Sequence, residues 1–127
     1  VGAEWGEGKR AKWLSSFTLA CKDGDTFKEI GKMGTGIKEK EGEGVTFQQL
    51  TDELKPLIIS EKGKEVTVKP KIIVEVSYEE IQKSPTYGSG FALRFPRLIR
   101  LRSMEKSFQD SSTLAMVNDL YYSQKKL

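Results

Sequence analysis

Apolar and polar residues alternate along several stretches of this chain, most clearly in 91–102. The apolar positions of one parity there are Phe91, Leu93, Phe95, Ile99 and Leu101. Side chains at every second residue of a β-strand lie on one face of the sheet. The same alternation predicts further strands at 13–21, 26–33, 66–68 and 71–78. Asp23-Gly-Asp25, between the segments 13–21 and 26–33, predicts a hairpin turn.

Two segments have helical spacing instead. Thr46 precedes Gln49 by three residues, as in a capping box, and Pro56 ends the pattern. The apolar stripe of this helix is expected to face the core rather than a partner. A last helix is predicted after Ser111 or Ser112, either of which suits the N-cap. Its apolar stripe consists of Leu114, Val117, Leu120 and Tyr121.

This order of elements predicts an all-β fold, a five-stranded Greek-key barrel of the OB (oligonucleotide-binding) type. One short helix is inserted in it and one helix follows at the C-terminal end. An SH3-like barrel is the nearest alternative. The length suits a single domain over 1–127. The chain starts without an initiator methionine and reads there like the tail of a strand, so we expect a fragment of a longer protein.

Composition removes several classes of site. The chain has no histidine, which excludes the commonest general base and zinc ligand. Its single cysteine, Cys21, excludes an internal disulfide, and its parity predicts a buried hydrophobe. No metal site is expected. No apolar run of about 18 residues and no signal peptide is present, so no membrane span is expected. One cysteine also fits a reducing intracellular compartment.

Arginines occupy the polar parity of the segment 91–102. Arg94, Arg100 and Arg102 are expected to project from one face, and a bulge at Pro96 would let Arg97 join them. Guanidinium groups match phosphate oxygens two at a time. No acidic residue lies between Glu80 and Glu105, so these arginines are expected to lack local partners and to meet an external anion. A solvated face with surface ion pairs is the alternative.

Two glycine-containing turns are weaker candidates for phosphate contact. The turn 6–10 carries Lys9 and Arg10, which either contact phosphate or simply solvate the loop. Gly34-Thr35-Gly36 lets a backbone approach a phosphate closely, with Thr35 as an added donor. A tight turn after a strand explains the same residues.

The sequence Arg94-Phe-Pro-Arg-x-x-Arg-x-Arg102, followed by Glu105 and Lys106, resembles the last conserved motif of the ATP-dependent DNA ligases. The resemblance is closest to the archaeal and eukaryotic replicative type, whose OB domain carries this motif. Three further segments resemble that domain in the same order: Gly-x-Gly-Lys-Arg-Ala, Ser-Phe-x-Leu-Ala-Cys and Gly-Lys-Met-Gly-Thr-Gly. No Lys-x-Asp-Gly occurs, so the chain alone is not expected to adenylylate itself.

The resemblance implies two roles for such a domain in nick sealing. It closes over ATP, presenting basic groups to the β- and γ-phosphates while a lysine of the nucleotidyltransferase domain is adenylylated. Arg102 and Lys106, then Arg100, are the implied pyrophosphate contacts, and Arg94, Arg97 and Lys106 the implied nucleotide-binding residues. The domain then clamps the minor groove beside the nick.

The implied DNA contacts are Phe95, Lys32, Thr35, Lys9 and Arg10. Phe95 resembles a phenylalanine that wedges into the minor groove, whereas its parity places it in the core, and both interpretations stay open. The chain departs from the family pattern at Ser103-Met-Glu-Lys106, with one residue inserted and glutamate replacing aspartate. The lysine therefore either still reaches the phosphates or is displaced.

The resemblance also implies cofactors, partners and location. The full-length enzyme would use ATP and Mg²⁺, with neither bound by this fragment alone. Its partners would be nicked double-stranded DNA, ATP, its own nucleotidyltransferase domain and a sliding clamp reached through missing regions. A monomer without membrane contact is expected in the cytoplasm or nucleoid, or in the nucleus of a eukaryote. The alternative is an independent OB module for single-stranded nucleic acid, and a protein-interaction domain using the last helix is a third reading.

Overall fold

Strands dominate the computed structural model, which describes residues 1–8, 11–34, 37, 45–102 and 112–124. The strands are β1 (Gly2–Trp5), β2 (Leu14–Asp23), β3 (Thr26–Met33), β4 (Ile58–Lys62), β5 (Glu65–Val68), β6 (Val74–Ser77), β7 (Glu80–Lys83), β8 (Phe91–Arg94) and β9 (Arg97–Leu101). The helices are α1 (Phe47–Leu54), the short 3-10 helix η2 (Lys55–Leu57) and α2 (Leu114–Gln124). The predicted OB-like all-β class is confirmed.

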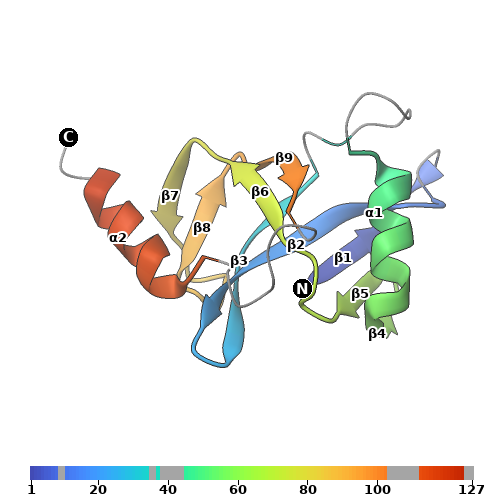
Figure 1. The fold of residues 1–127 in the computed structure, drawn as a ribbon, viewed down its shortest axis with the longest axis horizontal. Coiled ribbons are helices and arrows are strands. Elements are labelled where there is room, and N and C mark those ends of the chain that lie inside the picture. The colour runs from blue at the N-terminus through green and yellow to red at the C-terminus, as the bar shows by residue number, and fades with distance from the viewer. Residues whose placement is uncertain (9–10, 35–36, 38–44, 103–111, 125–127) are drawn as a thin grey trace.

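Five strands form one antiparallel sheet in the order β3-β2-β1-β5-β4, and β6–β9 and β7–β8 form two further antiparallel pairs. The consecutive strands β3 and β4 lie at opposite edges of the large sheet, joined by the connection that carries α1. The two α-helices lie at opposite ends of the long axis of the molecule (Figure 1).

The hairpin of β2 and β3 forms where the sequence predicts it. Asp23 pairs with Thr26 across the turn, and Gly24 adopts φ 62°, which a residue without Cβ reaches at little cost. The Thr26 hydroxyl donates to the Asp23 carbonyl at 2.9 Å. The alternation along β2 buries Phe17, Leu19 and Cys21, as expected.

Helix α1 starts at the predicted cap and is tied to β2. The Thr46 hydroxyl accepts a 3.0 Å hydrogen bond from the amide of Gln49. Thr51 is fully buried, and its hydroxyl accepts from the Leu14 amide at 2.9 Å while donating to the Phe47 carbonyl at 2.7 Å. The ring of Phe47 stacks on Trp13 with centroids 5.9 Å apart. The helix therefore faces the core, as its stripe predicts.

The core lies between the sheets and the two helices. Its buried apolar residues are Ala3, Leu14, Phe17, Leu19, Cys21, Ile30, Met33, Phe47, Leu50, Leu54, Val66, Val68, Ile81, Phe91, Leu98, Val117 and Tyr121.

Helix α2 packs beside β7 and β2 (Figure 1). Its first turn is capped by Thr113, whose hydroxyl accepts from the Met116 amide at 3.2 Å, so the predicted cap at Ser111 or Ser112 was wrong. The Gln124 side chain bonds both backbone groups of Ile81: its Oε1 accepts from the amide at 3.1 Å, and its Nε2 donates to the carbonyl. This amide closes the edge of β7 that faces away from β8.

The predicted strand 91–102 is two strands. Phe95 adopts φ 52° and Pro96 cannot donate to a ladder, so β8 ends at Arg94 and pairing resumes at Arg97 with a different partner. Beyond this break the parity of burial changes: Leu98 is buried, whereas Ile99 is 50% exposed. The expectation that Ile99 shares the core face with Phe91 was therefore wrong, and of the two interpretations of Phe95 the core position is excluded.

Candidate phosphate-binding site

One carboxylate on β6 holds two arginines of the β9 segment. Glu75 is paired with Arg100 in the register of these antiparallel strands. Its Oε2 lies 3.3 Å from Nε of Arg100, and its Oε1 accepts a 2.9 Å hydrogen bond from Nη1 of Arg102. The Arg102 amide donates to the Ile73 carbonyl at 2.7 Å, which extends the pairing past the end of β9. Among the described contacts, one carboxylate thus bridges two guanidinium groups.

Solvent exposure differs between the two arginines. The side chain of Arg100 is 54% exposed, that of Glu75 38%, and that of Arg102 only 21%. Arg102 is therefore partly shielded from water, which strengthens its electrostatic interactions. Arg100 is the group that a ligand in solution reaches first.

The expectation that the arginines lack acidic partners was wrong. Glu75 pairs with Arg100 and Arg102, and Arg94 has two glutamates nearby. These carboxylates precede the arginine segment in sequence and face it across strands β6 and β7. They do not lie between the arginines in sequence. The predicted strand 71–78 nevertheless indicated one of them, because Glu75 lies on its polar parity. Opposite charges are favoured on facing positions of neighbouring strands.

Arg94 is held on β8 by the facing strand β7. It is paired with Glu80 in the register, and its Nη1 donates to Glu80 Oε1 at 2.9 Å. Its Nε lies 4.0 Å from Glu79 Oε2. The hydrogen bond from Arg94, more than its charge, lowers the pKa of Glu80. Three of the four arginines thus fall into two ion-paired groups: Arg94 pairs with the glutamates at the start of β7, and Arg100 and Arg102 pair with Glu75 on β6.

Phe95 and Arg97 flank the proline at the break between β8 and β9. Phe95 is 66% exposed, so its side chain does not lie in the core. Arg97 is also exposed, and within the described residues it forms no ion pair, so its place beside the other arginines stays a prediction.

Of the other candidate contacts, only Lys32 is described. It lies on β3, and its Nζ donates to Glu4 Oε1 at 3.3 Å. That hydrogen bond and the charge of Glu4 raise the pKa of Lys32, so the ammonium stays protonated at neutral pH. Thr35, Lys9, Arg10 and Lys106 lie outside the described residues, as does the insertion before Lys106.

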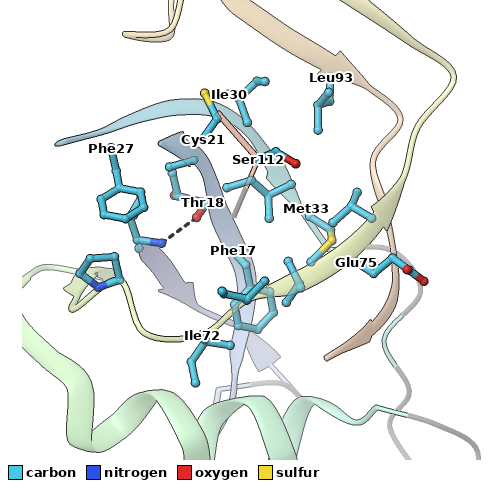
Figure 2. Close-up of a pocket in the computed structure, with 18 of the residues that line it drawn as sticks. Phe17, Thr18, Cys21, Phe27, Ile30, Met33, Ile72, Glu75, Leu93 and Ser112 are labelled. Atoms are coloured by element: carbon cyan, nitrogen blue, oxygen red, sulfur yellow. Dashed lines mark hydrogen bonds between the residues drawn. The ribbon is translucent and has the colours of Figure 1, made fainter. Parts of the chain in front are cut away.

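A mostly apolar cavity of about 390 Å³ lies inside the fold behind the arginine cluster. Figure 2 shows Phe17, Ile30 and Met33 around it, with Glu75 on the β6 side. The Val1 amine lies at its wall and donates to the Thr18 carbonyl at 3.1 Å. Apart from Glu75 and Arg102 at its wall, the cavity is lined mostly by apolar residues of the core.

The remaining candidate groups do not form a second site within the part of the chain that the structure describes. Across the described ranges, no group of three or more Cys, Asp or Glu is arranged to hold a metal ion. Cys21 is buried, which raises the pKa of its thiol and disfavours the nucleophilic thiolate. Neither α1 nor α2 has the length and apolar character needed to cross a membrane.

Comparison with known proteins places this arrangement in context. The family described as "ATP dependent DNA ligase C terminal region" matches residues 10–105. A DNA ligase of Nanoarchaeum equitans is 54% identical over 98% of the chain, covering 23% of that protein. DNA ligases of Archaeoglobus fulgidus and Methanothrix thermoacetophila are 50% and 47% identical over 95% and 98% of the chain, covering 21% and 22% of theirs.

The chain therefore spans less than a quarter of the length of these relatives. The family match covers the β2–β3 hairpin, α1, and the arginine cluster with its facing glutamates. The resemblance seen in the arginine motif is thus confirmed over most of the sequence. This chain belongs to the family of the C-terminal region of ATP-dependent DNA ligases.

Proposed function

We propose that this chain is the OB domain of an ATP-dependent DNA ligase and assists nick sealing in two steps. In the first it presents Arg102 and Arg100 to the β- and γ-phosphates of ATP. In the second it lies against the minor groove of nicked duplex DNA, with Phe95 at the groove. The nucleophilic lysine belongs to the nucleotidyltransferase domain of the same protein, beyond this chain.

The observation that carries the first step is the bridge of Glu75 to Arg100 and Arg102. The side chains of Arg100, on β9, and Arg102, just beyond it, converge on the Glu75 carboxylate at 3.3 and 2.9 Å. The arrangement holds two guanidinium groups in a fixed place, and guanidinium groups match phosphate oxygens in pairs. Arg97, which forms no ion pair among the described residues, adds positive charge nearby in sequence, which supports a polyanionic ligand over a single carboxylate.

The proposed chemistry is electrostatic. The lysine nitrogen attacks the α-phosphorus, an N–P bond forms, and the bond from that phosphorus to the bridging oxygen breaks. The electron pair stays on the departing pyrophosphate, whose negative charge therefore grows in the transition state. Fixed cations at that position stabilise the transition state without the reorganisation that water would need. Lys106 is proposed to share this role.

The proposed DNA contacts lie on other parts of the surface. Phe95 is an exposed apolar ring, suited to contact with sugar and base edges in the minor groove. Lys32 offers a phosphate contact that is independent of sequence, as Thr35, Lys9 and Arg10 would.

The cofactors, partners and location remain part of the proposal. The full-length enzyme is proposed to use ATP and a divalent cation, with Mg²⁺ the expected ion, and to act as an intracellular monomer. The roles proposed for the arginines are direct contacts with phosphate oxygens. A sliding clamp would be bound through other regions of the protein.

The test uses full-length ligase carrying Arg102→Ala, with Lys62→Ala on the exposed strand β4 as the matched control. Self-adenylylation should fall about 100-fold in the first variant, because one stabilising donor to a developing anion is lost. Sealing of nicks that already carry AMP should fall much less. Equal losses in both assays would contradict the assignment.

The alternative of a single-strand-binding module is separated by binding measurements. Affinity for nicked duplex and for single strands is compared over a salt series with the full-length protein. We expect nicked duplex to bind more tightly at every salt concentration. A preference for single strands would favour the module.

A further inference from the structure

We propose that Glu75 is a positioning residue, which holds the guanidinium groups of Arg100 and Arg102 together so that they receive a pyrophosphate as a pair. This inference rests on the proposed function and adds to it an acidic residue that lies outside the arginine motif. The carboxylate itself is not proposed to touch the ligand.

The geometry makes Glu75 the only described carboxylate bridging both groups. It faces Arg100 directly in the β6–β9 register, and the chain continues to Arg102 with its backbone still paired to Ile73. Ile99 is passed over in the register, since Val76 faces Leu98 and Glu75 faces Arg100. This bulge aligns Arg100 and Arg102 with the glutamate while Leu98 enters the core.

Like charges this close repel each other. Without Glu75, the Arg100 guanidinium would move away from that of Arg102 and sample more rotamers. With Glu75 present, each guanidinium group has one nitrogen held by the carboxylate. Arg100 approaches Glu75 through Nε, and within the described residues its terminal nitrogens form no hydrogen bond. Those nitrogens are therefore available to phosphate oxygens in a fixed orientation.

An opposite role is conceivable, in which Glu75 occupies the place of phosphate and competes with it. Exposure argues for positioning. Arg102, which makes the shorter contact, is 21% exposed, and Glu75 is 38% exposed beside it. Arg102 thus lies deepest in the cluster, the carboxylate lies at intermediate depth, and the more exposed Arg100 lies toward solvent, where a ligand arrives.

The experiment compares Glu75→Gln and Glu75→Asp in full-length ligase, with Glu61→Gln on β4 as the matched control. Single-turnover self-adenylylation is measured, and so is the reverse reaction of AMP-loaded enzyme with inorganic pyrophosphate. We expect Glu75→Gln to slow self-adenylylation about 10-fold and to raise the KM for pyrophosphate. Sealing of nicks that already carry AMP should change less than twofold. The Asp variant keeps the charge and should retain more activity than the Gln variant.

A double-mutant cycle separates positioning from a general effect on folding. In an Arg100→Ala background, Glu75→Gln should cost much less than it does alone, because the pair to be held together no longer exists. Thermal unfolding of each variant sets a temperature at which all are folded.

Four outcomes would overturn the inference: a Gln variant as fast as the unmodified enzyme or faster, an Asp variant no better than Gln, equal loss in the sealing step, or full additivity with Arg100→Ala. Any of these with an impaired Arg102→Ala variant would leave the proposed function intact. A normal Arg102→Ala variant would instead remove the proposed function itself.

Discussion

The guanidinium carbon of Arg94 lies 5.2 Å from the centre of the Phe95 ring. The same guanidinium donates to Glu80, so the cation that stacks on the ring is itself held by β7. Phe95 has a left-handed backbone conformation at φ 52°, which costs about 1–2 kcal/mol for a residue other than glycine. The Phe95 ring is therefore exposed and held by a cation, on a strained backbone, rather than packed in the core.

Replacing Phe95 with alanine in the full-length ligase should weaken binding to nicked duplex and slow sealing, with self-adenylylation unchanged. The free energy of unfolding should change by only about 0.5 kcal/mol, because the ring is mostly in solvent. Phe91→Ala is the control: this buried ring should cost about 3–5 kcal/mol. Chemical denaturation and single-turnover sealing measure the two effects. A loss of stability in Phe95→Ala like that of Phe91→Ala would contradict the contact role.

Replacing Lys32 with alanine should weaken binding to nicked duplex to the same extent for every DNA sequence. One phosphate contact fewer reduces the slope of log affinity against log salt by about 1. The Lys32 ammonium is fixed by Glu4, so it needs little ordering on binding. A salt titration of the full-length protein measures the slope, with Lys62→Ala as the matched control. An unchanged slope would remove Lys32 from the interface.

Raising the pH from 6 to 8 should stabilise the 127-residue chain. Burial lowers the pKa of the Val1 amine from 8.0 to about 6, against the opposing charge of Glu29. Between these values the unfolded chain binds more protons than the folded one, so the free energy of unfolding rises with pH. The difference between a pKa of 8.0 and one of about 6 corresponds to about 2–3 kcal/mol. Urea denaturation across this range measures the step.

A glycine added before Val1 is the matched control for the pH effect. The charged amine then lies one residue farther from the Thr18 carbonyl, and the pH-dependent step should shrink. A step of the same size in both proteins would mean that another group titrates.

Replacing Thr51 with valine should cost about 1–3 kcal/mol of stability, because the buried Leu14 amide loses its acceptor. Thr51→Ser keeps the hydroxyl and should cost less. Equilibrium denaturation of both variants gives the comparison. Equal losses would indicate that the methyl group matters more than the hydrogen bond.

The elements that the sequence predicts are those with an apolar face. β2 and β3 alternate clearly and are joined by Gly24, and α1 has Thr46 as its cap, so their local signals agree with the fold. β4 and β7 were not predicted. Every residue of β4 but Ile58 is exposed, and β7 buries only Ile81, so these strands are extended because a neighbour pairs with them rather than because of their own pattern.

Much the same distinction applies to the candidate site. The arginines are visible in the sequence because they are close together along it. Their glutamate partners are not, because Glu75 and Arg102 are 27 residues apart and meet only across the β6–β9 ladder. The direction of Phe95 depends on one backbone angle beside Pro96, which no alternation of residues encodes.

The Gln124 amide occupies the position that a neighbouring strand would take beside β7. A chain shortened by its last helix would therefore present an open β-edge to solvent, with the backbone groups of Ile81 unpaired. Such edges recruit copies of themselves. Self-association is thus the expected behaviour of the truncated domain, whereas in the longer chain the Gln124 side chain covers this edge at Ile81.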